Sequence, residues 1–412
     1  MTAKRIVITG IGITSPLGGT TQDTWKNLLG GVSGASSLEQ EWAKTYELPV
    51  HFAAQAAVPA ADVLQRIETK RLDPSSQFAL IAAREAWQDA GAPEVDPERL
   101  LVDWATGIGG VWTLLDAWDT LRERGPRRVL PMTVPMLMPN GPAAAIGMDL
   151  GARGGERTVV SACASSTESL ANAYDHIQAG LADIVVAGGS EAAIHPLPLA
   201  SFAAMQALSK RNDDPSIASR PYDVDRDGFV LGEGAAALIV ETEEHAKARG
   251  ARIYAELLGG AVTSDAYHIT APDPEGSAAA RAMRAAVENV GYSLEDVVHV
   301  NAHATSTPVG DIAEYNALRR VFGDHLDSIS VTATKASTGH LLGGAGAIEA
   351  AFTALSLYER VAPPTINLEH QDPEIPLDVV TEPRDLGTGD LLAISNSFGF
   401  GGHNAVVALR SI

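Results

Sequence analysis

The single cysteine of this 412-residue chain lies where a strand-like segment gives way to a helix-like one. Residues 159–166 run from an extended apolar stretch into small residues, and Leu170, Tyr174 and Ile177 then recur at helical spacing. Cys163 is therefore predicted at the N-terminus of a helix. Unpaired backbone N–H groups at such a terminus favour a thiolate and can hold a developing oxyanion. A lone cysteine between alanines is also typical of buried packing, so other residues must decide its role.

Two histidines stand just beyond predicted strands. His303 follows the strand predicted at 297–301, and His340 lies in the loop after the strand predicted at 329–332. Ligands of open α/β sheets gather at the carboxyl ends of strands. A thiolate attacks a thioester well and leaves again easily, and neutral imidazole N–H groups can stabilise an enolate. These residue types therefore suit acyl transfer followed by carbanion chemistry, with no metal or organic cofactor.

A third loop, residues 396–404, combines three glycines with two phenylalanines. Glycines at this density allow the backbone to turn sharply and to come close to another group. A tight turn is the alternative interpretation of the same composition.

The elements that must position these residues follow an α/β pattern. Short β-branched segments alternate with longer alanine-rich stretches of helical period, which is typical of mostly buried strands. Strands are predicted at residues 4–9, 157–161, 183–187, 297–301, 329–332 and 391–395. Residues 159–165 and 331–337 weakly repeat one another, which predicts two similar halves whose loops meet face to face. We expect an N-terminal half, 1–250, with the cysteine, and a C-terminal half, 251–412, with both histidines.

Charge and composition exclude several classes of protein. The 51 acidic and 30 basic residues give a net charge of −21, which argues against nucleic-acid binding. No apolar run approaches the length of a membrane span, and no signal peptide is recognisable, so a cytoplasmic protein is expected. One cysteine cannot form an internal disulfide, and no repeated Cys-x-x-Cys or His-Glu-x-x-His pattern predicts a metal site.

Taken together, these segments resemble the condensing-enzyme family, and within it the elongating β-ketoacyl-acyl carrier protein synthases. The resemblance covers nearly the whole chain and rests on motifs in a fixed order: residues 7–12, the cysteine loop, 219–223 with 226–229, both histidine loops, 363–367 and 396–404. The family implies an α/β thiolase-type fold of two duplicated halves in five layers. It also implies a homodimer whose substrates are carried on the phosphopantetheine of an acyl carrier protein.

The resemblance assigns roles to the candidate catalytic residues. Cys163 resembles the nucleophile that takes an acyl chain from the carrier protein, with its own N–H and that of Phe400 as oxyanion hole. His303 and His340 resemble the pair that stabilises the enolate formed when a malonyl thioester loses carbon dioxide. Lys335 resembles the lysine that orders this site. Its expected charge partners are Glu349 and either Asp311 or Glu314.

Other positions match the family's substrate channel and its partner surface. Phe400 matches a gate between acyl tunnel and malonyl site, and the pantetheine arm is expected at Thr270, Thr305 and Thr307. Expected tunnel walls and further substrate contacts are Ile108, Leu137, Phe202, Leu342 and Phe398. Basic clusters expected to dock the carrier protein are Arg66, Lys70, Arg71, Arg127, Arg128, Lys210 and Arg211. Ala304, where many relatives have glycine, and the unusual residues 103–105 leave the acyl-length preference open.

Related classes of protein fit less well. Thiolases need a second cysteine, and priming synthases have asparagine where His340 follows Gly339. A chain-length factor lacks the nucleophile, and a binding protein with an incidental thiol leaves both histidine loops unexplained. Aromatic polyketide synthases share much of the middle of the chain, but residues 396–404 look like fatty-acid synthesis. We therefore expect elongation of fatty acids by two carbons, with a polyketide ketosynthase as the alternative.

Overall fold

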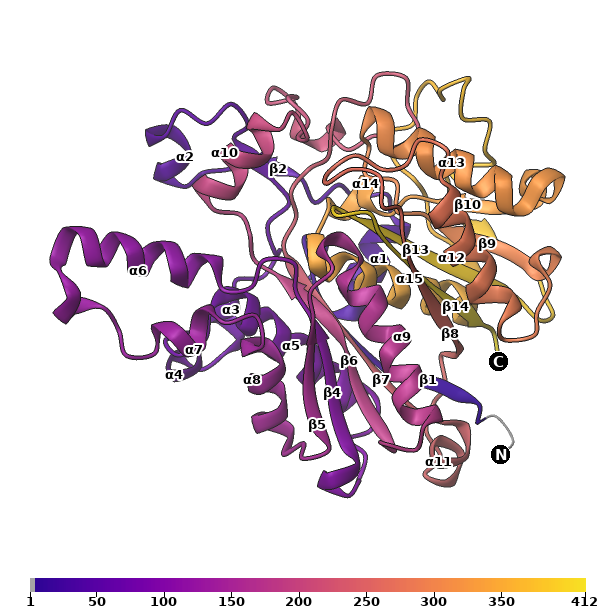
Figure 1. The fold of residues 1–412 in the computed structure, drawn as a ribbon, viewed down its shortest axis with the longest axis horizontal. Coiled ribbons are helices and arrows are strands. Elements are labelled where there is room, and N and C mark those ends of the chain that lie inside the picture. Colours follow the sequence, from indigo (N-terminus) through magenta and orange to yellow (C-terminus); the bar gives the residue numbers. More distant parts are fainter. Residues whose placement is uncertain (1–3) are drawn as a thin grey trace.

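The computed structural model describes residues 4–412, and one mixed sheet runs through the molecule (Figure 1). The strands from the first part of the chain are β1 (Ile6–Thr14), β4 (Leu100–Ala105), β5 (Gly155–Val159), β6 (Ile184–Glu191) and β7 (Gly234–Thr242). Those from the second part are β8 (Ala255–Ser264), β9 (Val297–Asn301), β10 (Ser330–Thr332), β13 (Leu392–Gly399) and β14 (His403–Arg410). Two small ladders pair β2 (Ser36–Ser37) with β3 (Phe52–Ala53) and β11 (Val361–Ala362) with β12 (Arg384–Asp385).

The strand order shows the duplication that the sequence predicts. The ten strands lie in the order β10-β9-β13-β14-β8-β1-β7-β6-β4-β5. Each half contributes five strands to this sheet. From either edge of the sheet toward its centre, the strands of a half follow in the same order: its third, second, fourth, fifth and first strand along the chain. The two halves join where β1 pairs antiparallel with β8, with Ile6 opposite Leu257. Equivalent loops of the two halves therefore face each other, as in a thiolase-type fold.

Two helices form the central layer. They are α9 (Ser165–Gln178) and α15 (Ala345–Glu359), which follow the third strand of each half. All residues of α15 from Ala345 to Leu357 are buried, which explains why this helix is mostly apolar, with Glu349 as an exception. The helices meet closely because Gly346 has no side chain: a Cβ there would lie 2.0 Å from Thr167 Oγ1.

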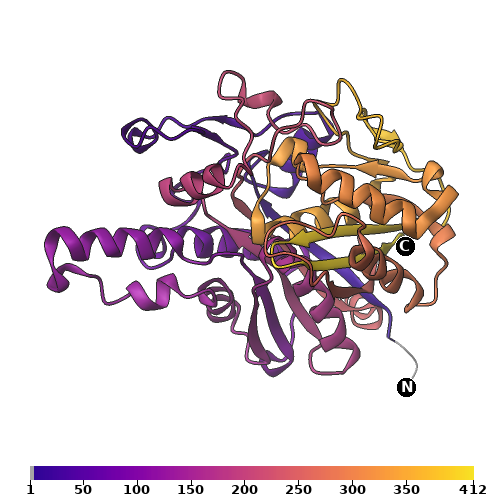
Figure 2. The same cartoon turned by 45° about the horizontal axis from the view of Figure 1, so that its top comes forward.

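Outer helices cover the other faces of the sheet (Figure 2). On the first half, α5 (Pro74–Asp89) packs on β1 and β7, and on the second, α12 (Ser277–Glu288) packs on β8 and β14, with α13 (Pro308–Phe322) beside it. The shorter helices are α1 (Thr21–Leu29), α2 (Glu41–Thr45), α3 (Ala60–Val63), α4 (Arg66–Thr69), α8 (Gly141–Leu150), α10 (Pro196–Ala204), α11 (Glu243–Ala248) and α14 (Lys335–Thr338). None of the helices in residues 4–412 has the length and apolar character needed to cross a bilayer.

One arm projects from this layered body. It consists of α6 (Val111–Arg124) and α7 (Thr133–Leu137), which extend to one side in both views (Figures 1 and 2). Apolar side chains on the arm are exposed, among them Leu114, Trp118, Leu121, Leu130, Met132 and Val134.

The strand predictions are right in part. The strand at 297–301 has the predicted bounds, whereas β1, β6 and β13 continue beyond the segments predicted for them. Four strands of the ten-stranded sheet, β4, β7, β8 and β14, lie outside the predicted segments. The alanine-rich start of β7 reads as helix, and two glycines interrupt β8. In these strands, packing on neighbouring helices overrides local propensity.

Candidate active site

The nucleophile candidate lies in a sharp turn between β5 and α9. Residues Ala162–Ala164 form a single 3₁₀ turn, and α9 begins at Ser165. Ala162 has a left-handed backbone with φ of 52°, which turns the chain abruptly before Cys163. Ser165 Oγ accepts the Ser161 N–H at 2.8 Å and so holds the turn in place. Cys163 therefore precedes the helix by two residues and is buried, with 9% of its surface exposed.

The equivalent turn of the second half is Leu342–Gly344, directly before α15, and Leu342 also has a positive φ of 47°. The repeat that the sequence suggests is therefore real but shifted. Gly343, and not Lys335, is the counterpart of Cys163. The helix α14, which carries Lys335, and the loop with His340 lie between β10 and this second turn.

Burial dominates the acidity of the thiol. Desolvation raises the pKa of Cys163 to about 12, although the charge of Lys335 and a hydrogen bond from the Phe400 N–H both act to lower it. The prediction from sequence that this position lowers the thiol pKa is wrong for the protein as it stands. The thiol is protonated at neutral pH, so it must lose its proton as it reacts.

The final glycine loop lies directly against this turn. A Cβ on Gly399 would lie 2.7 Å from Ser161 O and 3.1 Å from Cys163 N, so only glycine fits there. This close approach lets the Phe400 N–H reach the Cys163 sulfur. Asp265, which the sequence does not single out, fixes the loop from behind: its backbone N–H donates to Gly402 O at 2.9 Å, and its carboxylate accepts from Asn404 Nδ2 at 2.7 Å.

His303 stands two residues beyond Asn301, the last residue of β9, and a buried carboxylate holds its loop. Glu314, on α13, accepts the backbone N–H groups of His303 at 2.9 Å and Ala304 at 2.7 Å. It also accepts from Asn396 Nδ2 at 3.0 Å. Glu314 therefore fixes the position of the His303 backbone.

His340 is held by a neighbouring extended segment. Its backbone N–H donates to Val230 O at 2.8 Å, and its carbonyl accepts from Gly232 N at 2.9 Å. The ring packs edge to face on Phe229, with ring centres 5.4 Å apart. Burial, and next the charge of Lys335, lowers the pKa of both His303 and His340 well below the usual value. Both imidazoles are therefore neutral at physiological pH.

Lys335 forms a buried ion pair with Glu349 on α15. Burial still raises the pKa of Glu349 to about 7, with Lys335 acting against that rise. Asp311 is not a partner of Lys335: its carboxylate accepts the N–H groups of Tyr222 at 3.0 Å and Ser306 at 3.1 Å and lies 3.7 Å from Arg226. Burial raises the pKa of Glu314, and the charge of Lys335 acts against that rise. The carboxylate itself is hydrogen-bonded to the His303 loop.

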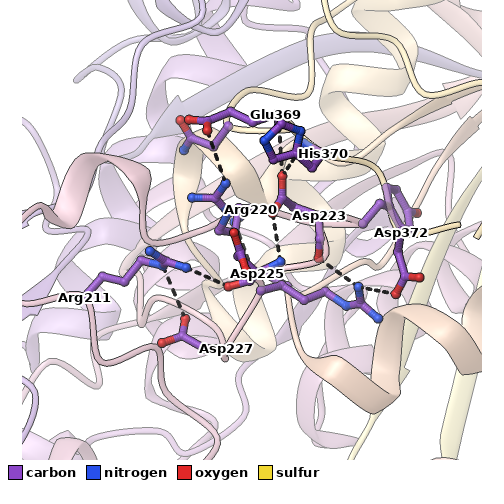
Figure 3. A network of polar contacts seen from close by, with 12 residues as sticks. Arg211, Arg220, Asp223, Asp225, Asp227, Glu369, His370 and Asp372 are labelled. Atoms are coloured by element: carbon purple, nitrogen blue, oxygen red, sulfur yellow. Dashed lines mark hydrogen bonds and ion pairs between the residues drawn. The ribbon is translucent and has the colours of Figure 1, made fainter.

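A network of ion pairs and hydrogen bonds joins residues 211–227 to residues 369–372 (Figure 3). Arg220 pairs with Asp223 at 3.1 Å, and Arg226 donates to Asp372 at 2.8 Å. The segment that carries Arg220 also contacts the His303 loop, because the Ser306 hydroxyl accepts the Arg220 backbone N–H at 2.9 Å. Arg211 donates to Asp225 O at 2.7 Å and lies 3.9 Å from Asp227, so its charge is largely satisfied within the chain.

These loops surround a cavity of about 430 Å³. Predicted residues that line it are Cys163, His303, His340, Phe398, Phe400, Ile108, Phe202, Leu342, Thr270, Thr305, Thr307 and Glu314. Residues not predicted also line it, among them Met205, Phe229, Asp265 and Asn404. Lys335 and Glu349 are buried behind this lining. Leu137 belongs to α7 of the arm and is not part of the lining of this chain's cavity.

Other predicted positions lie outside the cavity. Arg66, Lys70, Arg71, Arg127, Arg128 and Lys210 are exposed. In residues 103–105, Asp103 bonds His176 Nδ1 at 2.6 Å and Trp104 Nε1 donates to Ser190 Oγ at 3.0 Å, and neither residue lines the cavity. Within residues 4–412, no group of three His, Cys, Asp or Glu side chains is placed to hold a metal ion.

Comparisons with known proteins agree with this geometry. The chain is 45% identical to 3-oxoacyl-[acyl-carrier-protein] synthase 2 of Mycobacterium tuberculosis, over 98% of this chain and 96% of that one. It is 45% identical to the enzyme of the same name from Staphylococcus aureus, over 99% and 98%. A type II polyketide ketosynthase, solved with its acyl carrier protein and bound to the hexaketide, superposes with a TM-score of 0.91 at 33% identity and 100% coverage of both chains.

Family profiles match both halves. The N-terminal domain of β-ketoacyl synthases matches residues 3–246, and the C-terminal domain of the same enzymes matches residues 254–369. Fold, buried thiol, paired neutral histidines and full-length similarity therefore agree, and the chain belongs to the β-ketoacyl synthase family.

Proposed function

We propose that this enzyme elongates acyl chains by decarboxylative condensation of a malonyl thioester with an acyl group held on Cys163. The observation that carries the proposal is the cavity shared by one buried thiol and two neutral imidazoles. Its similarity to enzymes named 3-oxoacyl-[acyl-carrier-protein] synthase 2, at 45% identity, favours fatty-acid elongation. The polyketide alternative is less favoured, because the polyketide ketosynthase is 33% identical.

In the first half-reaction, Cys163 Sγ attacks the acyl thioester. The new S–C bond forms as the bond to the pantetheine sulfur breaks, and the thiol proton ends on the departing pantetheine thiolate. Because burial keeps Cys163 protonated, attack and proton loss must be coupled. The N–H groups of Cys163 and Phe400 are the proposed donors to the tetrahedral oxyanion, and the close approach of Gly399 to Cys163 N supports this role.

In the second half-reaction, a malonyl thioester takes the place of the first carrier. Its C–C bond breaks, carbon dioxide leaves, and the electron pair remains as an enolate. N–H groups of His303 and His340 donate to the enolate oxygen, which neutral rings can do without transferring a proton. The carbanion then attacks the acyl carbonyl, forms the new C–C bond and expels the Cys163 thiolate.

The nucleophile and the two histidines come from different halves of the duplicated fold. We propose a join at 250/251, between α11 and β8, with the thiol in the N-terminal half and both histidines in the C-terminal half. The family profiles, which end at 246 and resume at 254, support this boundary. The prediction that no cofactor is needed beyond carrier-protein phosphopantetheine stays a prediction, as does the cytoplasmic location.

We also propose a homodimer, formed through β5 and the arm. Within residues 4–412, β5 pairs only with β4 and leaves one edge of the sheet open, and such edges favour pairing with another chain. Val160, next to this edge, is 54% exposed, and so is Trp118 on the arm. A second copy that adds its own β5 would extend the sheet and could cover this apolar surface.

Sedimentation analysis tests the dimer. Trp118→Asp combined with Leu121→Asp should convert a dimer into monomers, because two charges would be buried in an apolar interface. Tyr46→Asp is the control, since Tyr46 is 61% exposed on α2, away from the arm. A wild-type protein that sediments as a monomer would reject the proposal.

Reconstitution tests the reaction itself. The purified enzyme is mixed with malonyl-carrier protein and one acyl-carrier protein, and the products are read by mass spectrometry. A single product two carbons longer supports elongation of fatty acids. Repeated extension without reduction indicates the polyketide alternative, and the absence of any extended product contradicts the proposed function.

A further inference from the structure

Glu191 is the last residue of β6 and lies beside the cavity. Neither proposed half-reaction uses its carboxylate. The side chain is fully buried, and among residues 4–412 no lysine, arginine or histidine forms an ion pair with it. It has four neutral donors instead. Oε2 accepts the backbone N–H groups of Gly107 at 2.8 Å and Gly343 at 3.0 Å, and Oε1 accepts that of Ile108 at 3.2 Å and the Thr106 hydroxyl at 3.1 Å.

These donors belong to two loops that wall the cavity. Gly107 and Ile108 follow β4, and Gly343 lies next to Leu342 in the turn before α15. Gly107, Ile108 and Leu342 all line the cavity. The loops also touch directly: a Cβ on Gly107 would lie 2.7 Å from Glu191 Oε2 and 3.2 Å from Gly343 N. One carboxylate therefore joins two walls contributed by different halves of the chain.

The second half of the fold contains a parallel arrangement. β4 and β9 are the second strands of their halves, and the loops after them carry Ile108 and His303. Glu314 accepts two successive N–H groups of the His303 loop, as Glu191 does for the Ile108 loop. The two carboxylates come from different elements, β6 and α13, so each loop is held by a buried carboxylate of its own.

We propose that Glu191 is a positioning residue: it fixes Ile108 and Leu342 around the acyl chain and so sets which acyl chains Cys163 accepts. The inference rests on the proposed function, because it concerns the acyl group in the first half-reaction. Glu191 acts through the backbone of the two wall residues.

Its charge has a second effect on the nucleophile. Lys335 on α14, Glu349 on α15 and Glu191 on β6 are the charged groups that act on Cys163, and the two carboxylates raise the thiol pKa. Burial raises the pKa of Glu191 itself to about 7, against the pull of its four donors. Glu191 is therefore ionised throughout the alkaline range in which the thiol titrates.

Two variants distinguish the effect of the Glu191 hydrogen bonds from the effect of its charge. Glu191→Asp keeps the charge but is one methylene too short to reach both loops. Glu191→Gln removes the charge, and its amide N–H groups must face either the Gly107 and Gly343 N–H groups at Oε2 or the Ile108 N–H group at Oε1. The control is Glu85→Gln: Glu85 also accepts two backbone N–H groups, from Ile13 and Thr21, each at 2.8 Å, but lies on α5 outside the cavity lining.

The first readout is acylation of Cys163 by a series of acyl-carrier proteins. For both Glu191 variants, kcat/KM for the longest chain that the wild type accepts should change relative to butyryl by on the order of tenfold, as expected when a pocket wall moves. Release of carbon dioxide from malonyl-carrier protein should stay close to wild type. Glu85→Gln should keep the wild-type ratio. An unchanged ratio in both Glu191 variants would overturn the positioning role.

The second readout is the rate of Cys163 alkylation by iodoacetamide against pH, which needs no acyl substrate. Glu191→Gln should react severalfold faster than wild type at each alkaline pH, and Glu191→Asp should stay near the wild-type rate. Equal acceleration in both variants would mean that the thiol has merely become more accessible, and it would overturn the electrostatic part. If the wild type formed no acyl-enzyme with any chain, the proposed function would fail while this readout still tested Glu191.

Discussion

His303 and His340 lie edge to face, with ring centres 5.4 Å apart and ring planes at 86°. They reach this position from loops after two different strands, and the Nδ1 atoms of both rings are buried without a hydrogen-bond partner in the described chain. Burial, and next the charge of Lys335, makes protonation of either ring unfavourable. Two neutral imidazoles therefore lie side by side, which is the arrangement that the proposed donation to one enolate oxygen requires.

This neutrality predicts the pH profile of decarboxylation. An ordinary imidazole gains its proton near pH 6.5, but the pKa of both rings lies well below that value. As pH falls from roughly 8 to 6, both rings keep the same charge, so they should add no loss of carbon dioxide release across the usual histidine range. Burial raises the pKa of Glu349 to about 7, so this carboxyl does titrate there. The measurement therefore compares wild type with Glu349→Gln, by release of labelled carbon dioxide from malonyl-carrier protein at saturating substrate. A loss of rate with a midpoint near 6.5 that persists in Glu349→Gln would mean that a histidine titrates normally.

Substitution of either histidine should separate the half-reactions. In His303→Ala or His340→Ala, the thiol proton can still leave with the pantetheine thiolate, so acyl-Cys163 should accumulate. Carbon dioxide release should fall by about a hundredfold or more, because one preorganised oxyanion donor is lost. Intact-mass analysis and the label assay measure the two steps. If one variant abolished acylation as fully as Cys163→Ala, that histidine would be the base for the thiol or a scaffold for its loop.

Removal of one partner of the buried Lys335–Glu349 ion pair should lower the free energy of unfolding more than removal of both partners. Lys335→Met leaves the Glu349 carboxylate buried without its cation, which should lower the free energy of unfolding by about 3–5 kcal/mol. Lys335→Met with Glu349→Gln should regain much of that loss. Urea unfolding of the three proteins measures this difference. A double variant less stable than the single one would show that the pair contributes net stability.

The exposed arginines at the tip of the arm should serve encounter with the acidic carrier protein. Charge reversal at Arg127 and Arg128 should raise KM for acyl-carrier protein, and the effect should shrink as salt rises. Small acyl thioesters should react as before. Arg281→Glu, an exposed position on α12, is the matched control. Equal effects on both substrate classes would reject docking at this surface.

Local motifs predict the centre of the site well. A lone thiol before a helix, a histidine after each of two strands and a glycine-rich loop each carry a local signal, and all of them line one cavity. The resemblance correctly gives Glu349 as a charge partner of Lys335, but neither Asp311 nor Glu314 forms an ion pair with this lysine. Which carboxylate lies within reach depends on contacts between distant elements, which no local pattern encodes.

Tertiary packing explains what the sequence did not predict. Glu191 and Asp265 are isolated acidic residues whose partners come from distant segments, so no spacing marks them. The thiol pKa was predicted in the wrong direction because desolvation comes from the whole surrounding fold. Leu137 fails as a wall of this chain's cavity because α7 belongs to the projecting arm.

Intact-mass analysis of the acyl-enzyme tests the central claim most directly. Wild type and Cys163→Ala are each mixed with acyl-carrier protein, weighed, and then chased with malonyl-carrier protein. The wild type should gain the mass of one acyl group, mapped to Cys163, and should lose it in the chase as a product two carbons longer appears. Cys163→Ala should show neither event. An acyl adduct or an extended product from Cys163→Ala would contradict the account.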